Sequence, residues 1–216
     1  MSGVEGELAT FMKEKKHLAQ YIVNQVNAKP GKASLIEASG DQSVIDSFVL
    51  VGGAFESDGK ATSGNKSWSA PASWDGRQRP WYKQAKQAGK LIVTPPYMDA
   101  TDNVMIISLA APIYDNGNFV GAIFFDVSLK GIAELVNKVD LFGAGNMIVT
   151  TKDGVIVADR DASNNGKNVR HVYQGASVNV HGQQGIQVDG KEIVLQFSEV
   201  PGTDYLVGGM LDEAIA

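Results

Sequence analysis

Residues 108–129 read SLAAPIYDNGNFVGAIFFDVSL, and this segment predicts a β-hairpin. Two strand-like apolar runs, residues 104–112 and 119–127, flank the turn residues Asp115, Asn116 and Gly117. Asn-Gly between two such runs is the strongest short-range signal for a hairpin. Asp-Gly pairs recur along the chain, so we expect antiparallel sheet throughout: they lie at residues 58–59, 75–76, 153–154 and 189–190.

Asp126 is the only charged residue in the apolar run 121–127 of this hairpin. A lone carboxylate is costly to bury unless a partner pairs with it. The alternative role is a cap for the helix expected from residue 128 onward, but Ser128 is better placed to cap it. We therefore expect Asp126 to face a ligand that carries a positive charge.

Upstream, residues 74–97 read WDGRQRPWYKQAKQAGKLIVTPPY and gather a cation with several aromatic rings. Arg79 can hold a ligand carboxylate with two parallel hydrogen bonds, and Asp99 can accept from a ligand ammonium. Trp81 and Tyr97 offer aromatic faces between them. The residues leave a second interpretation open, in which Arg-Pro-Trp-Tyr is simply the capped and packed start of a helix.

The remaining pattern predicts helices and short strands on both sides of this region. Residues 4–29 form a long amphipathic helix that Pro30 and Gly31 end. Its length suggests packing along a second domain or a partner helix, with a plain core helix as the alternative. Residues 63–73 form a loop whose Trp68 either covers the pocket or lies in an ordinary exposed loop. Further helices are expected at 79–89 and 128–139, and strands at 48–51, 91–94, 146–150, 155–158, 192–197 and 205–210.

These motifs resemble the double-Cache extracellular sensor domain of bacterial methyl-accepting chemotaxis proteins, in its amino-acid-binding class. The resemblance implies that an arginine and tryptophan side holds the ligand carboxylate, while a tyrosine and aspartates hold its ammonium. The first aromatic position is usually tyrosine; Trp74 can donate a hydrogen bond there but cannot accept one, which leaves the choice of ligand open. The implied ligand-binding residues are Trp74, Arg79, Trp81, Tyr97, Asp99 and Asp126.

The resemblance also implies an α+β fold of two PAS-like antiparallel-sheet modules braced by a long N-terminal helix. The expected parts are the helix at 1–30, a membrane-distal Cache module at 31–127, a linking helix at 128–140 and a membrane-proximal Cache module at 141–216. The second half lacks the arginine, tryptophan and aspartate cluster of the first. We therefore expect the ligand in the membrane-distal module.

Composition excludes several other classes of function. The net charge of −5 does not support a basic surface for nucleic acid, and no cysteine is present for disulfides or thiolate chemistry. The chain contains no common catalytic or nucleotide-binding motif, so we expect neither an enzyme nor a cofactor. Its three histidines are scattered without the spacing of a metal site. With no apolar run of about 18 residues, the sequence itself contains no membrane-spanning segment.

Together these observations predict a periplasmic sensor domain of an inner-membrane chemoreceptor that binds an L-amino acid. Flanking membrane helices, absent from this sequence, would anchor the native protein, and the N-terminal helix would pair with a second copy in a homodimer. The alternative ligand is a quaternary or biogenic amine held in an aromatic cage. That cage would use Trp74, Trp81, Tyr82 and Tyr97 with Asp99 and Asp126 as counter-charges, and it requires Arg79 to turn outward.

Overall fold

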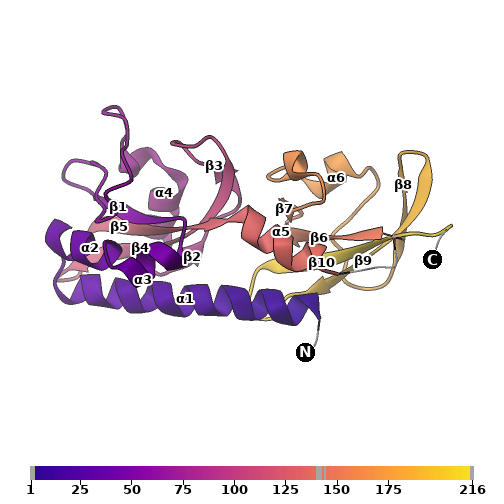
Figure 1. Cartoon of the computed structure of the whole chain (residues 1–216), viewed down its shortest axis with the longest axis horizontal. Coiled ribbons are helices and arrows are strands. Elements are labelled where there is room, and N and C mark those ends of the chain that lie inside the picture. The colour runs from indigo at the N-terminus through magenta and orange to yellow at the C-terminus, as the bar shows by residue number, and fades with distance from the viewer. Residues whose placement is uncertain (1–2, 140–142, 144, 215–216) are drawn as a thin grey trace. The chain divides into compact units, whose positions relative to one another are not determined.

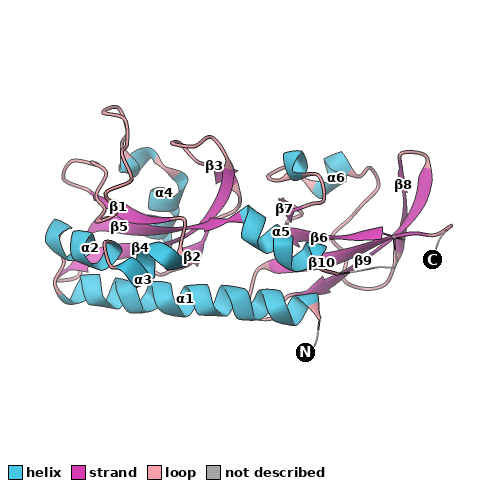
Figure 2. Cartoon of the chain, in the orientation of Figure 1, coloured by secondary structure: helices cyan, strands magenta, loops and turns pink. Residues whose placement is uncertain are grey.

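The computed structural model describes residues 3–139, 143 and 145–214, which fall into two compact units (Figure 1). One unit is Glu14–Ser128, which we call the first-sheet unit. The other, the second-sheet unit, combines Met1–Lys13 with Leu129–Ala216. Each unit is built on one antiparallel sheet with helices packed against it (Figure 2).

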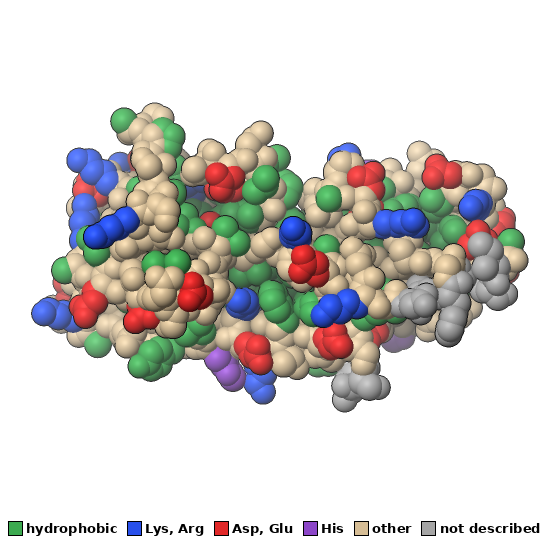
Figure 3. Space-filling model, in the orientation of Figure 1, with side chains coloured by type: hydrophobic (Ala, Val, Ile, Leu, Met, Phe, Trp, Pro, Cys, Tyr) green, Lys and Arg blue, Asp and Glu red, His purple; other side chains and the backbone are tan. Residues whose placement is uncertain are grey.

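The N-terminal helix α1, Val4–Ala28, ends just before Pro30 and Gly31, as predicted. Its buried apolar side chains lie three, four or seven residues apart, on one side of the helix: Leu8, Met12, Ala19, Ile22 and Val26. The apolar stripe that marks this helix in the sequence therefore packs within the chain itself. None of the helices described is long and apolar enough to cross a membrane. Acidic and basic side chains are interspersed over the face of the molecule that Figure 3 shows.

The first sheet has the strand order β1-β5-β4-β2, and β3 also pairs with β4. The predicted hairpin is confirmed, because β4 and β5 pair from Asp115↔Asn118 outward across the Asn-Gly turn. A bulge between Ile113 and Tyr114 shifts their register by one residue. The strands are β1 (Leu50–Phe55), β2 (Ile92–Val93), β3 (Tyr97–Met98), β4 (Met105–Asp115) and β5 (Asn118–Ser128).

Helix α4, Pro80–Ala88, packs against β4 and β5. Its start matches the prediction, since Pro80 occupies the first turn and Gly89 ends the helix in the left-handed conformation at φ 68°. Before it, the short 3-10 helix η1 (Gly76–Gln78) is capped by Asp75, whose carboxylate accepts from the Arg77 N–H. Two short helices were not expected, α2 (Lys32–Ser39) and α3 (Gln42–Ser47).

The second sheet has the order β7-β6-β10-β9-β8 and includes the predicted strands. Helix α5, Leu129–Asn137, packs against β6 and β7, and the segments η2 (Ala162–Asn164) and α6 (Val169–Val172) follow β7. The strands are β6 (Gly145–Thr151), β7 (Ile156–Ala158), β8 (Gln184–Val188), β9 (Lys191–Glu199) and β10 (Tyr205–Asp212). Strand β8 and helix α6 were not expected from the sequence.

Two antiparallel sheets with a long N-terminal helix confirm the predicted α+β fold class. The division into 1–30, 31–127, 128–140 and 141–216 stays a prediction.

Candidate ligand-binding site

The residues singled out from the sequence surround one pocket on the first sheet. They come from four places in the chain: the segment before η1, the start of α4, strand β3 with its following turn, and strand β5. The lining includes all of Trp74, Arg79, Trp81, Tyr97, Asp99 and Asp126. It also includes Leu50, Trp68, Ala100, Thr101 and Phe124.

Asp126 is almost completely buried, at 5% exposed. Its Oδ1 accepts a hydrogen bond of 2.6 Å from the hydroxyl of Ser108, which lies opposite it on β4. The Tyr97 hydroxyl lies 2.6 Å from the same Ser108 oxygen. Because Ser108 has one hydroxyl proton and directs it to Asp126, Tyr97 must donate to Ser108. A chain of hydroxyl groups thus runs from Tyr97 to the buried carboxylate.

Burial raises the pKa of Asp126 from 3.8 to about 7. The hydrogen bond from Ser108 and the positive charge of Arg79 both lower the pKa of Asp126, whereas the negative charge of Asp99 raises it further. Burial also raises the pKa of the Tyr97 phenol, and the Asp126 charge adds to that effect. Within the described part of the chain, Asp126 forms no ion pair. A cationic group that entered the pocket would supply the missing partner.

Arg79 is the N-cap residue of α4, where the backbone is still extended. This conformation lets the guanidinium and the Trp81 ring line the same pocket although the two residues are only two positions apart. The guanidinium donates to the Met98 carbonyl oxygen at 3.0 Å and lies 5.7 Å from the centre of the Tyr97 ring. Among the described residues, Arg79 has no carboxylate partner, so it keeps donors available for a ligand.

Asp99 lies in the turn after β3 and is half-buried. Its carboxylate accepts backbone N–H groups from Thr101 at 3.3 Å and Asp102 at 3.4 Å. Both are long hydrogen bonds, and each carboxylate oxygen retains accepting capacity. A second anionic group is therefore available in the lining that also holds Asp126.

Aromatic rings form the apolar wall of the pocket. Trp81 stacks with Trp74 at 6.4 Å between ring centres and contacts Phe124 at 4.8 Å. Trp68 meets both Trp74 and Phe124 edge-on, at 5.5 and 5.6 Å. Gly52 in β1 permits this arrangement, because a Cβ there would lie 3.1 Å from both the Trp68 and the Phe124 ring. The wall is preorganised by contacts among its own side chains.

Tyr82, proposed for an aromatic cage, does not line the pocket. It follows Trp81 on α4, and consecutive helical residues point in different directions. Its ring is buried, with Trp81 on one side and Phe119 at 5.6 Å on the other. Tyr82 is therefore a core residue, and the proposed cage loses one of its rings.

The cavity between these side chains measures about 20 Å³. That is room for about one water molecule, and even glycine is larger. The exposed turn after β3 and the loop carrying Trp68 close it, since the Trp68 indole N–H donates to the Thr101 hydroxyl at 3.5 Å. A much larger cavity, about 790 Å³, lies in the second-sheet unit. The buried unpaired carboxylate makes the smaller pocket the better candidate.

Comparison with known proteins identifies the family of this chain. The Cache domain family matches residues 2–216, nearly the whole chain. This chain belongs to the dCache_1 family of Cache domains. This chain is 31% identical to the methyl-accepting chemotaxis protein McpA of Pseudomonas putida over 148 residues, and the match covers 66% of this chain. The chain spans only 23% of the length of that relative.

Solved structures share the fold. The ligand-binding domain of Mlp24, solved with asparagine, is 37% identical with a TM-score of 0.84, and the match covers 96% of this chain and 87% of that one. The ligand-binding domain of the Pseudomonas aeruginosa chemoreceptor PctB, solved with L-Arg, has a TM-score of 0.88 at 21% identity. That match covers 98% of this chain and 92% of the PctB domain. The relatives are thus chemoreceptors and their ligand-binding domains.

Sequence reasoning missed four lining residues, Leu50, Ala100, Thr101 and Phe124. It also missed Ser108, which is not part of the lining but donates to Asp126. A serine in a predicted strand gives no sign of its own, and only the cross-strand register identifies it as the partner of Asp126. Among the described residues, no group of three or more His, Cys, Asp or Glu side chains is arranged to hold a metal ion.

Proposed function

We propose that this Cache domain is the sensor domain of a chemoreceptor and that its first-sheet unit binds an L-amino acid. The observation that carries the proposal is the pairing of opposite unpaired charges in one pocket. Asp126 is buried and accepts from the Ser108 hydroxyl, and among the described residues neither Asp126 nor Arg79 has an oppositely charged side-chain partner. A ligand with both an ammonium and a carboxylate neutralises both groups. The likeness to the Mlp24 domain, solved with asparagine, supports the same class of ligand.

In the proposed pose the ammonium faces Asp126, Tyr97 and Asp99. The carboxylate takes two hydrogen bonds from Arg79 and lies on the Trp81 side, where an indole N–H can also donate. The α-carbon and side chain then meet Trp74 and the other rings of the wall. Trp74 stands where the family usually has a tyrosine, so it can shape ligand choice without accepting a hydrogen bond.

An amine without a carboxylate is the weaker candidate. It would leave Arg79, which lines the pocket, facing a cationic ligand with no anion between them. Electrostatic repulsion would then oppose binding instead of assisting it. The loss of Tyr82 from the proposed cage weakens this alternative further.

We propose that this pocket binds its ligand and performs no reaction on it. Ser108, whose hydroxyl donates to Asp126, is completely buried and does not line the pocket. A buried hydroxyl is a poor nucleophile because a substrate cannot reach it. The relatives are named as chemotaxis receptors, which agrees with a binding module.

For the native receptor, we infer a periplasmic domain anchored by flanking membrane helices and paired with a second copy. The chain covers less than a third of the length of its chemotaxis relatives, which leaves room for such parts. The apolar stripe of α1 is buried within the chain, so a dimer through α1 would use its outer face. That face carries Tyr21, a large apolar side chain that is 62% exposed.

Ligand entry requires the pocket to open, because its present volume is about 20 Å³. The segment best suited to move is the exposed turn of residues 100–103, which the Trp68 indole contacts through Thr101. Breaking one long hydrogen bond there costs little compared with moving a sheet strand.

A thermal-shift screen of the twenty protein L-amino acids tests the proposal. A ligand at about a hundred times its Kd stabilises the fold by about 2.7 kcal/mol, a rise in Tm of roughly 5–11 °C for a chain of this size. All three tryptophans of the chain line the pocket, so the same ligand should change the intrinsic fluorescence. If no amino acid shifts Tm or fluorescence, the proposal fails.

A further inference from the structure

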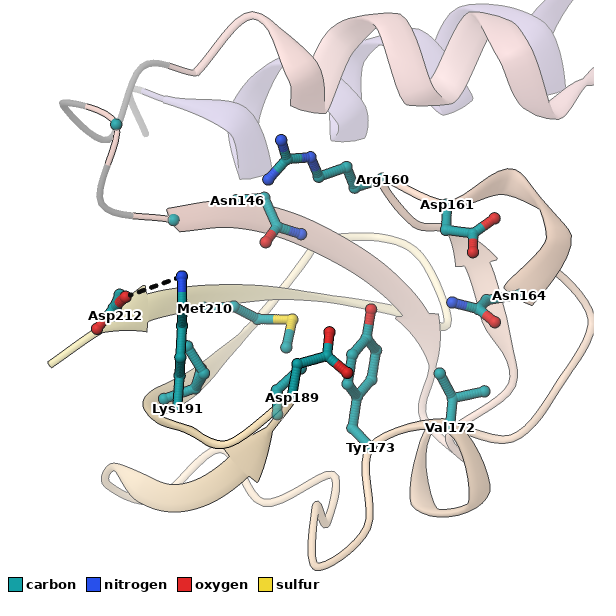
Figure 4. Close-up of a pocket in the computed structure, with 14 residues that line it drawn as sticks. Asn146, Arg160, Asp161, Asn164, Val172, Tyr173, Asp189, Lys191, Met210 and Asp212 are labelled. Atoms are coloured by element: carbon teal, nitrogen blue, oxygen red, sulfur yellow. Dashed lines mark ion pairs between the residues drawn. The ribbon is translucent and has the colours of Figure 1, made fainter.

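The second-sheet unit contains a cavity of about 790 Å³ (Figure 4). It lies on the face of the second sheet that η2 and α6 line, and its size falls in the range of about 300–1,000 Å³ typical of small-molecule sites. Its apolar part comes from Val172, Val188, Ile193 and Met210. The polar part carries both signs of charge, from Arg160, Asp161, Asp189, Lys191 and Asp212.

This cavity is the topological counterpart of the pocket on the first sheet. In each sheet the first strand pairs with the last, and the last pairs with the strand before it: β1-β5-β4 and β6-β10-β9. Asp126 lies near the end of β5, and Asp212 ends β10. Each of these aspartates is mostly buried and lines the cavity of its own unit. The second fold thus repeats a carboxylate at the corresponding strand end.

The cavity also contains charges that the protein leaves unpaired. Arg160 and Asp189 are both exposed, and within the described part of the chain neither charged side chain makes a hydrogen bond or an ion pair with another side chain. Water therefore solvates both charges until a ligand replaces it. Figure 4 shows Arg160 with Asn146 on one side of the cavity and Asp189 with Tyr173 on the other. Lys191 and Asp212 are 3.9 Å apart, longer than a hydrogen bond, so this ion pair is weak.

Two lining residues of the cavity, Tyr173 and Asn164, are held by Asp159, which is 4% exposed. Its carboxylate accepts from the Tyr173 hydroxyl and from the Asn164 amide, both at 2.7 Å. The Arg160 backbone N–H donates to its other oxygen at 2.8 Å. Asp159 is therefore fully paired and structural, and it fixes the backbone from which Arg160 extends.

We propose that this cavity is a second binding site, for a small amphoteric molecule that carries a carboxylate and an ammonium group. Arg160, aided by the Asn146 amide, takes the carboxylate, and Asp189 with Asp212 takes the ammonium. A metal ion fits less well, because no group of acidic side chains among the described residues has the arrangement of a metal site. The site follows from the second-sheet unit alone and does not depend on binding in the first.

Calorimetry on the whole 216-residue chain tests this site after the first one is disabled. The background protein carries Arg79→Ala and Asp126→Asn, and the probes are the twenty protein L-amino acids. We expect at least one of them to bind this protein with one site per chain. Adding Arg160→Gln or Asp189→Asn should weaken that binding by about tenfold to a hundredfold, the effect of losing one charge-assisted hydrogen bond.

Two choices make the result interpretable. Asp189 has a positive φ of 51°, which asparagine tolerates, so Asp189→Asn preserves the turn. The matched control is Arg170→Gln, an exposed arginine on α6 outside the cavity, and it should leave binding unchanged. A background protein that melts normally but binds no probe overturns the second site. So does binding that Arg160→Gln and Asp189→Asn both leave unchanged.

The two proposals fail in different ways. If a probe binds the wild type but does not bind the protein with Arg79→Ala and Asp126→Asn at all, that result overturns only the second site. Binding that survives those changes but is lost with Arg160→Gln supports the second site, whatever happens in the first.

Discussion

Replacing Asp126 with asparagine should remove ligand binding and at the same time stabilise the free domain. The side chain is nearly isosteric, and its amide oxygen can still accept from Ser108. What the change removes is a buried negative charge with no cationic partner among the described residues. In the free protein that charge is costly, and in the complex it would hold the ligand ammonium.

The expected size follows from the pKa of Asp126, which burial raises from 3.8 to about 7. This rise corresponds to about 4 kcal/mol of destabilisation once the group is ionised in both states. The new amide N–H needs an acceptor and can cost about 1–3 kcal/mol without one. A net gain of about 1–3 kcal/mol, or roughly 2–12 °C in Tm, is therefore expected above pH 7.

The dependence on pH has a definite sign. The folded domain keeps the Asp126 proton up to about pH 7, whereas the unfolded chain releases it near pH 4. Stability from this group therefore falls as pH rises from about 4 to 7 and stays constant above that range. The advantage of Asp126→Asn should be absent near pH 4 and complete at pH 8. Binding to the wild type should weaken by about tenfold for each pH unit below 7, because the ligand pairs with the ionised carboxylate.

Thermal unfolding of both proteins at pH 4.5, 6 and 8 without ligand measures this effect. Asp115→Asn is the matched control, since Asp115 is an exposed carboxylate at the turn of the same hairpin. It should show no comparable gain between pH 4.5 and 8. A variant that is less stable than the wild type at pH 8, or that still binds the amino acid normally, would refute the reasoning.

Three further predictions concern neighbouring features. Arg79→Ala should leave the fold intact, because the Arg79 side chain caps no backbone group of α4. The change should weaken amino-acid binding by about 2–5 kcal/mol. If calorimetry gives a near-native Kd for this variant, Arg79 does not contact the ligand. Thr101→Val removes the acceptor of the Trp68 indole, so stopped-flow fluorescence should show faster association, whereas an unchanged rate excludes this contact as a barrier to entry. Light scattering at high protein concentration should detect a weak dimer that Tyr21→Lys disrupts. Pairing through α1 is contradicted if the wild type is purely monomeric and Tyr21→Lys also leaves the full-length receptor unaffected.

Much of this fold was predictable because its signals are local. The Asn-Gly turn fixed the β4–β5 hairpin, and the apolar period with Pro30 and Gly31 fixed α1. The helix predicted from residue 79 begins one residue later, at Pro80, because Arg79 is its extended N-cap residue. By contrast, α2 and α3 are short, with few buried side chains, so no clear periodicity reveals them.

The partner of Asp126 could not be predicted from the turn. Counting outward from Asp115↔Asn118 places Ile107 opposite Asp126. The bulge at Ile113 and Tyr114 shifts the register by one, and Ser108 takes that position instead. A bulge has no reliable sequence signal, so the hydroxyl chain appears only in three dimensions.

The second cavity was missed for a different reason. Arg160, Asp189 and Asp212 are far apart in the sequence and lie in unrelated local contexts. Only the sheet order and the segments over it bring them to one cavity. A compact motif marks the first pocket in the sequence, and no such motif marks this cavity.

The central claim is that the first pocket needs both charges of its ligand, and calorimetry of a matched triplet tests it most directly. The triplet is the L-amino acid that the screen identifies, the amine it yields on decarboxylation and the acid it yields on deamination. Each truncated ligand leaves Arg79 or Asp126 desolvated and unpaired, which costs about 2–5 kcal/mol, or roughly thirtyfold to several thousandfold in Kd. We predict that, of the three, only the amino acid binds tightly. Equal affinity for the amine would contradict the role of Arg79, and equal affinity for the acid would contradict the role of Asp126.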